Sequence, residues 1–211
     1  VRSGDERYSR RTVMNILVVT NTWPSLSEVF VKNLVDGLLE RNSSVTVLCK
    51  KSKGSRTTGY HGHGGSILYF TAKKTIVTMI HLLLVLPVFF FLKPSAFFSL
   101  WGNLAIHHDF STLLAPLAWF QVRNERFDAI HCQFGDLGNI GLILKKAGIK
   151  TGPVISSFRG SDISSYYKRK PTVYRVLQRK GDLFFPVCAE FRDRLVHVSY
   201  THLTLPTINY V

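Results

Sequence analysis

The adjoining segments MNILVVT (Met14–Thr20) and NTWPSLSEVF (Asn21–Phe30) decide how this chain folds. The first is an apolar, β-branched run and predicts a buried strand. The second predicts a turn that opens a helix over Glu28–Arg41. That helix places these apolar residues on one stripe: Phe30, Val31, Leu34, Val35 and Leu38. A phosphate-binding junction of this kind usually carries glycines, whereas this one carries Trp, Pro, Ser and Glu.

Two functions are open for this junction. Ser25-Leu26-Ser27-Glu28 matches the S-x-x-E capping box, and Pro24 favours the turn before it. The same helix start also points free backbone N–H groups and a positive dipole end outward. An anion placed there gains about 0.3–1 kcal/mol at an exposed site. The stretch is therefore a capped helix whose capped end can also face an anion.

Strand and helix patterns alternate along the rest of the chain. Further strands are predicted at SVTVLC (Ser44–Cys49), SILYF (Ser66–Phe70), DAIHCQF (Asp128–Phe134), PVISSF (Pro153–Phe158) and DLFFPV (Asp182–Val187). Helices are predicted at Leu137–Ala147 and from about Ala189. The alternation predicts an α/β fold, a Rossmann-like parallel sheet with helices on both faces, and an apolar helical insertion over residues 73–120. Ligands of such sheets bind at the carboxyl ends of the strands.

Composition restricts the class of partner. The 211 residues are 45% hydrophobic, which supports a packed core, and the net charge of +14 indicates anionic partners. The basic residues are dispersed without zinc-finger or RNA-binding signatures, so nucleic acid is not expected as a partner. Cys49, Cys132 and Cys188 each lie in an apolar run, which predicts free, buried thiols.

The apolar middle of the chain has three possible roles. Thr75–Leu92, TIVTMIHLLLVLPVFFFL, lies between Lys73–Lys74 and Lys93 and is borderline in length for a span of about 20 residues. His81 and Pro87 interrupt it. It is buried or interfacial, it crosses a membrane, or it forms an oligomer contact. Lysines beside exposed apolar side chains are typical of an interfacial helix on anionic lipid.

Two further strand ends carry candidate site residues. In SSFRGSDIS (Ser156–Ser164), Arg159 is a permanent cation suited to phosphate, and Asp162 either caps the next turn or faces the site. In HCQFGDLG (His131–Gly138), Gln133 and Gly135 follow a strand, and His131 is expected to be a hydrogen-bonded interior residue. HGHG (His61–Gly64) lacks supporting carboxylates or thiols, so no metal site is predicted.

Four segments in register resemble the N-terminal half of retaining glycosyltransferases of family 4, of the bacterial exopolysaccharide and colanic-acid type. They are NILVVTNTWPSLSEVFV, FDAIHCQFG, SFRGSDI and DLFFPVCAEFRDRLV. The resemblance implies the acceptor-side domain of a GT-B fold, a nucleotide-sugar donor, transfer with retention of configuration, and neither a cofactor nor a required metal. Catalysis would then consist of positioning and of stabilising the charge of the leaving diphosphate.

The resemblance also assigns roles to residues. The implied catalytic residues are Arg159 and Asp162. The implied substrate-binding residues are Thr22, Ser25, Ser27, Glu28, Gln133, Gly135, Gly160 and Ser161. Many family members have His where Arg159 stands, so a role that needs neutral imidazole does not transfer. Electrostatic support of the leaving group is expected from Arg159 instead.

The resemblance sets expectations for organisation and location as well. We interpret residues 1–13 as an upstream extension, 14–197 as the acceptor-side domain and 198–211 as a non-native tail. The donor-binding domain is expected to be missing from these residues, which would leave the chain inactive alone. The expected partners are a nucleotide-sugar, a lipid-linked or glycan acceptor, and the anionic inner face of a bacterial cytoplasmic membrane. The alternatives are a stand-alone membrane-peripheral module that pairs with a donor-domain subunit, and an integral membrane protein anchored by Thr75–Leu92.

Overall fold

A computed structural model describes residues 13–23, 29–52, 65–71, 75–107, 110–159, 162, 174–189 and 192–193. The predicted upstream extension up to residue 12, the HGHG tract (His61–Gly64) and the tail at 198–211 lie outside the described residues. The helix predicted from about Ala189 also falls mostly outside them.

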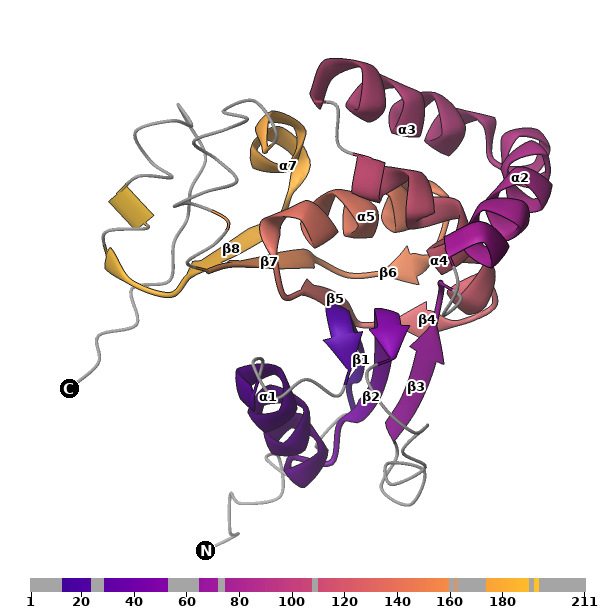
Figure 1. Ribbon diagram of the computed structural model, residues 1–211. Coiled ribbons are helices and arrows are strands. Elements are labelled where there is room, and N and C mark those ends of the chain that lie inside the picture. The colour runs from indigo at the N-terminus through magenta and orange to yellow at the C-terminus, as the bar shows by residue number, and fades with distance from the viewer. Residues whose placement is uncertain are drawn as a thin grey trace, which may run out of the picture.

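A six-stranded sheet forms the centre of the fold (Figure 1). Its strands, in spatial order, are β3 (Gly65–Tyr69), β2 (Ser44–Ser52), β1 (Asn15–Trp23), β5 (Ala129–Cys132), β7 (Val154–Phe158) and β8 (Leu183–Pro186). Every neighbouring pair is parallel. With the six strands counted along the chain, this is the 3-2-1-4-5-6 order of Rossmann folds. The predicted α/β class and Rossmann-like sheet are confirmed.

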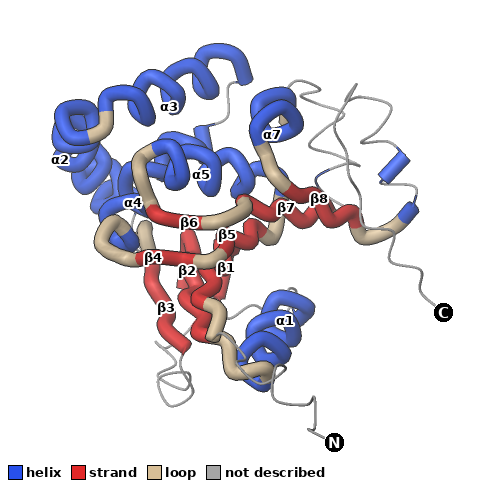
Figure 2. The backbone as a smooth tube through the Cα atoms, turned by 180° about the vertical axis from the view of Figure 1, so that it is seen from behind, coloured by secondary structure: helices blue, strands red, loops and turns tan. Residues whose placement is uncertain are grey.

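Helices cover both faces of the sheet (Figures 1 and 2). α1 (Val29–Glu40) lies on one face. The other face carries α4 (Ala115–Val122), α5 (Gly135–Lys146) and α7 (Arg175–Lys180), with α2 (Thr75–Leu92), α3 (Pro94–His107) and the 3-10 helix η3 (Phe110–Leu114) outside or beside them. A small parallel pair, β4 (Arg126–Phe127) and β6 (Lys150–Thr151), lies beside the main sheet. The predicted apolar helical insertion is therefore two helices, α2 and α3, followed by η3 and α4.

Alternation along β1 separates two hydrophobic cores. Leu17 and Val19 point toward the helices from α2 to α5, whereas Ile16 and Val18 point toward α1. All four side chains are buried, because a strand with helices on both faces exposes neither side to water. Burial on both faces therefore explains why the sequence of β1 is a continuous apolar run.

Several boundaries differ from the sequence expectations. β1 extends to Trp23, so Thr22 lies within a strand, paired with Lys51, and not in the following turn. α5 begins at Gly135, two residues before its predicted start. The predicted strand at 128–134 is shorter in the structure, where β5 covers only Ala129–Cys132. Asp128 precedes it, and its Oδ2 accepts a 2.7 Å hydrogen bond from the Asn15 N–H.

The three cysteines are free, but only two match the expectation of burial. Cys49 and Cys132 are buried in β2 and β5, and burial raises the pKa of the Cys132 thiol. Cys188 is exposed, so that part of the prediction is wrong. The strand β8 ends at Pro186, and the chain has left the sheet where Cys188 stands.

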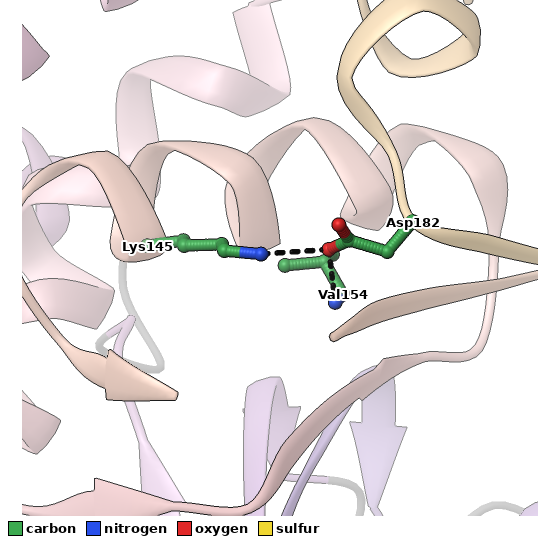
Figure 3. A network of polar contacts seen from close by, with 3 residues as sticks. All are labelled: Lys145, Val154 and Asp182. Atoms are coloured by element: carbon green, nitrogen blue, oxygen red, sulfur yellow. Dashed lines mark hydrogen bonds and ion pairs between the residues drawn. The ribbon is translucent and has the colours of Figure 1, made fainter. Parts of the chain in front are cut away.

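Asp182 connects the start of the last strand, β8, to β7 and to helix α5 (Figure 3). Its Oδ2 accepts a 2.7 Å hydrogen bond from the Val154 N–H, at the start of β7. The same oxygen forms a 2.8 Å ion pair with Lys145 Nζ in the last turn of α5. One carboxylate thus joins α5, β7 and the entrance to β8.

Candidate functional site

The described candidate residues lie at one edge of the sheet. Parallel strands bring their carboxyl ends to the same edge, and the chain order reverses between β1 and β5. This reversal is the topological switch point, where open α/β sheets bind their ligands. Gln133 follows β5 directly, and Arg159 follows β7 directly. The structure therefore brings these two predicted residues together.

The Arg159 side chain reaches from the end of β7 to the end of β5 and to helix α1. Its Nη2 lies 3.4 Å from Gln133 Oε1, and its guanidinium carbon lies 3.6 Å from the centre of the Phe30 ring on α1. The Phe30 ring also meets the Phe134 ring edge-on, with centroids 6.3 Å apart. An arginine stacked on an aromatic face stays charged, since its pKa lies far above neutral pH. We call Arg159, Gln133 and Phe30 the arginine cluster.

Gln133 contributes a buried amide to the arginine cluster. Its backbone N–H donates a 2.9 Å hydrogen bond to the Val19 carbonyl, which ties the end of β5 to β1. Its side chain is fully buried, and its Nε2 has no hydrogen-bond partner within the described part of the chain. A buried donor without an acceptor costs about 1–3 kcal/mol, which a ligand oxygen would recover.

Asp162 is buried beneath Arg159 and holds the loop after β7. Its Oδ2 accepts a 2.9 Å hydrogen bond from the Arg159 N–H, and its Oδ1 accepts one of 3.1 Å from the Tyr174 hydroxyl. Its own N–H donates a 2.9 Å bond to the Arg159 carbonyl. The turn-capping role considered for Asp162 is therefore present, and this carboxylate positions the backbone that carries the arginine.

Burial dominates the electrostatics of that carboxylate. It raises the pKa of Asp162 to about 7, against the lowering effect of the hydrogen bond from the Arg159 backbone. The nearby Asp136 raises this pKa further, while the Tyr174 hydroxyl and the Gly135 backbone lower it. The pKa of Asp162 therefore lies near neutral pH, well above the ordinary Asp value of about 3.9. Such a displaced pKa is common where a protein holds a functional site.

Gly135 has a packing role at this edge. It is the first residue of α5, and a Cβ built on it would lie 2.6 Å from Tyr174 Cε1 and 2.7 Å from Phe158 Cε1. The two rings meet edge-on, with centroids 5.1 Å apart. Because only hydrogen fits between α5 and these rings, Gly135 lets the helix start close to Asp162. The residue is buried beneath the site and does not line an open surface.

His131 behaves as an interior strand residue, as expected. Its Nε2 lies 2.9 Å from Ser157 Oγ on the neighbouring strand β7. Burial, together with the charge of Arg159, lowers the pKa of His131 to about 4. The ring is therefore neutral at physiological pH, so Arg159 supplies the positive charge at this edge.

Four residues of this edge were not singled out from the sequence: Phe30 for its ring contact, Lys50, Asp136 and Tyr174. Lys50 Nζ in β2 lies 3.9 Å from Asp136 Oδ2 in the first turn of α5, and both side chains are mostly buried. An acidic residue in a first helical turn is a recognisable signal that could have identified Asp136. Tyr174 carries no such local signal, because its partner Asp162 is set by the tertiary fold.

Five of the remaining predicted site residues lie outside the described residues: Ser25, Ser27, Glu28, Gly160 and Ser161. Thr22 is described and partly buried in β1. Within the described ranges, no group of three His, Cys, Asp or Glu side chains could hold a metal ion.

The fold and this edge define the chain as a Rossmann-like α/β domain with a cation at its topological switch point. Neither protein-family models nor curated proteins match the sequence.

Proposed function

We propose that this chain is the acceptor-side domain of a retaining glycosyltransferase. The enzyme would transfer a sugar from a nucleotide-sugar to a lipid-linked or cell-surface glycan, in bacterial exopolysaccharide or lipopolysaccharide synthesis. The carrying observation is the arginine cluster, in which Arg159 and the buried Gln133 amide meet at the switch point of the sheet. The four resembling segments support the proposal, because each contains the carboxyl end of one strand of the sheet: β1, β5, β7 or β8.

The proposed reaction exchanges one bond at the anomeric carbon. The bond from that carbon to the diphosphate oxygen breaks, and a bond from it to the acceptor oxygen forms. The acceptor proton passes to the departing diphosphate, which leaves with the bonding electron pair. Arg159 would stabilise the negative charge that develops on the diphosphate, and such fixed charges can be the largest single contribution to catalysis.

The other residues of the edge would act through position. Gln133 Nε2 would donate its hydrogen bond to a substrate oxygen, since it has no acceptor within the described part of the chain. Asp162 would be a positioning residue, because its carboxylate holds the Arg159 backbone and not the reacting atoms. The nucleoside part of the donor is assigned to a second domain or subunit. No cofactor or metal has a role in the proposal.

The first test measures binding of inorganic pyrophosphate, used as a probe for the leaving group, by calorimetry on the 211-residue chain. We expect Arg159→Ala to weaken binding by about tenfold or more, because one charge-assisted contact is worth roughly 1.5–3 kcal/mol. Arg159→Lys should recover part of the loss. Arg175→Ala removes an exposed charge on α7 and should bind as wild type. Equal binding by all four proteins would exclude the anion site.

The second test addresses transfer itself. Long-read sequencing of the source DNA from the codon of Leu195 onward would show whether the frame encodes a second α/β domain. If it does, the whole product is assayed for sugar transfer from nucleotide-sugars to a bacterial lipid extract. Normal turnover by both Arg159→Ala and Arg159→Lys would refute the role of Arg159. A frame that ends at Val211 would favour the alternative of a binding module that pairs with a separate donor subunit.

A further inference from the structure

One side of α2 is apolar and uncovered. Its apolar residues that are more than half exposed are Ile76, Met79, Ile80, Leu83, Leu84, Phe91 and Leu92. All of them except Leu92 lie on one stripe of the helix. The exposed fraction reaches 79% at Phe91 and 71% at Leu83. An apolar helix normally forms the core of a protein or lies in a membrane. Only 17% of the residues of α2 are buried in the protein, so α2 is not a core helix.

The opposite side of α2 is attached to the domain. Thr78, Leu82 and Phe89 are buried, at a spacing that places them on one face of the helix. The Phe89 ring meets the Trp119 ring of α4 edge-on, with centroids 5.4 Å apart. Leu82 and Phe89 belong to the same core as β1 and α5. A helix packed along its length on an α/β layer cannot cross a bilayer without carrying that layer into the hydrocarbon.

The length of α2 is compatible with a span and with an in-plane orientation. Within the described residues it is the one helix long and apolar enough to cross a membrane. Its 18 residues reach about 27 Å, slightly less than a hydrocarbon core of about 30 Å. An orientation parallel to the membrane plane would place its exposed stripe in lipid while its buried stripe stays on the protein.

The corner between α2 and α3 extends the apolar surface. Phe90 packs on Phe97 with ring centroids 4.9 Å apart, and Phe97 stacks on Trp101 at 6.3 Å. Phe98 and Trp101 are more than half exposed on α3. Figures 1 and 2 both place α2 and α3 at the outside of the domain, across the sheet from α1. We call the exposed side chains of α2 together with Phe98 and Trp101 the outer face.

The helices that carry and border the outer face contain no acidic residue. The sequences of α2, α3 and α4 contain no Asp or Glu. Lys93 stands at the corner, with its Nζ 5.9 Å from the Trp119 ring, and the Arg123 guanidinium lies 4.0 Å from the Phe120 ring at the end of α4. Basic side chains lying along aromatic rings can reach headgroups while their stems stay in the apolar zone. This pattern favours anionic lipid over a neutral apolar partner.

From these observations we infer that the outer face is a monotopic membrane-docking surface: α2 and α3 lie in the plane of an anionic bilayer. Their exposed side chains enter the acyl region by about 5–10 Å, the depth typical of interfacial helices. Arg123, which is exposed at the end of α4, contacts the headgroups. The inference stands without the proposed transferase activity, since it rests on α2, α3 and α4 alone.

The docking surface borders the edge of the sheet that carries the arginine cluster. Tyr69, Phe70 and Thr71, at the carboxyl end of β3, line a hollow of about 370 Å³ together with Leu84 and Phe120. β3 and β7 are four strand positions apart, which corresponds to roughly 19 Å. The headgroup of a lipid-linked acceptor in the docked membrane would therefore have a short distance to cover.

The test is co-sedimentation of the 211-residue chain with vesicles of phosphatidylcholine, alone or with 30 mol% phosphatidylglycerol, a composition of roughly physiological anionic content. Leu83→Glu/Phe91→Glu places two charges on the outer face. Val29→Glu/Val187→Glu makes the same exchange at exposed apolar residues outside it and serves as the matched control. We expect wild type and control to bind anionic vesicles, and the outer-face variant to partition at least about tenfold less. Circular dichroism of each variant verifies that it is folded.

Trp101 provides a second, independent measurement. The chain has three tryptophans, and Trp23 and Trp119 are buried in the protein. Brominated lipid should therefore quench fluorescence from Trp101, and Trp101→Phe should abolish the quenching. Equal sedimentation of the outer-face variant and the control, or absence of quenching, would overturn the inference.

Two other occupants of the outer face give different results. If a second copy covers it, light scattering shows a dimer that Leu83→Glu/Phe91→Glu dissociates, and vesicles do not bind. If α2 spans the membrane, alkaline carbonate fails to release the expressed chain from bacterial membranes. Either result refutes in-plane docking. Pyrophosphate binding is unaffected in both cases, so the two proposals fail separately.

Discussion

Replacing Asp162 by Asn isolates the cost of burying one carboxylate beneath the arginine cluster. The side chain is only 4% exposed, and burial raises its pKa from 3.8 to about 7. Asn has the same shape and keeps an oxygen that can accept the hydrogen bond from the Arg159 N–H. The Tyr174 hydroxyl can reverse its role and accept from the new amide. The substitution therefore removes the titration with little change in packing.

The magnitude follows from the shift. Each pKa unit corresponds to 1.36 kcal/mol, so a rise from 3.8 to about 7 amounts to roughly 4 kcal/mol. Because the folded pKa lies above the unfolded one, the folded state binds more protons between these values. The contribution of Asp162 is fully present below pH 3.8 and is lost as the pH rises through about 7.

His131 acts in the opposite direction over part of this range. Its pKa falls from 6.5 to about 4 on folding, because burial and Arg159 disfavour the charged ring. The unfolded state then binds more protons, so stability rises between pH 4 and pH 6.5, by roughly 3 kcal/mol. The two effects nearly cancel in the wild-type protein below pH 6.5. Only a comparison with the variant separates them.

The assay is urea unfolding of wild type and Asp162→Asn at several pH values from 4 to 8, followed by far-UV circular dichroism. The free energy of unfolding of wild type relative to the variant should fall by about 4 kcal/mol across this range. The variant alone should gain stability up to pH 6.5, through His131. Asp193→Asn, at an exposed carboxylate, serves as the control. Parallel profiles for wild type and Asp162→Asn would refute the buried-carboxylate account.

Three further predictions concern packing, thiol access and the anchor of β8. Gly135→Ala should lower the free energy of unfolding by about 1–3 kcal/mol, because the added Cβ would collide with buried aromatic rings. Gly37→Ala is the control, because a Cβ added there in α1 meets open space. In the same urea titrations it should be neutral or stabilise the protein by up to about 1 kcal/mol. A thiol reagent should modify one cysteine rapidly in the folded chain, and Cys188→Ser should remove that fast phase. Asp182→Ala should destabilise the folded protein by about 1 kcal/mol, because the hydrogen bond from the Val154 N–H is lost. Added salt should change this loss little, since the exposed ion pair of Asp182 with Lys145 contributes little to stability.

Each of these has a clear contrary result. Equal stability of the two glycine variants would show that α5 moves away from the rings without cost. Rapid labelling of two or three thiols would show that Cys49 or Cys132 is accessible. A loss at Asp182 that disappears in high salt would assign the effect to Lys145 and not to the backbone bond.

The sequence was sufficient for features that depend on local periodicity. The β-branched run at Ile16–Thr20 predicted a strand covered on both faces, because a strand between two helical layers needs apolar residues in every position. The stripe on Glu28–Arg41 predicted α1 to within one residue at each end. The order of these elements, together with the parallel-sheet rule, predicted that Gln133 and Arg159 would lie at one edge.

Only the tertiary structure decided how the side chains at that edge are used. Arg159 stacks on Phe30, Gly135 fits beneath Tyr174, and Tyr174 donates to Asp162, all between elements that are distant along the chain. The pKa of a carboxylate depends on the groups that surround it in the folded protein. No pattern in the sequence near Asp162 therefore indicates that its pKa lies near neutral pH. Burial of α2 is likewise a property of the whole domain. Its composition allowed a buried or interfacial helix, a membrane span or an oligomer contact. The packing of one stripe against α4 left the other stripe exposed.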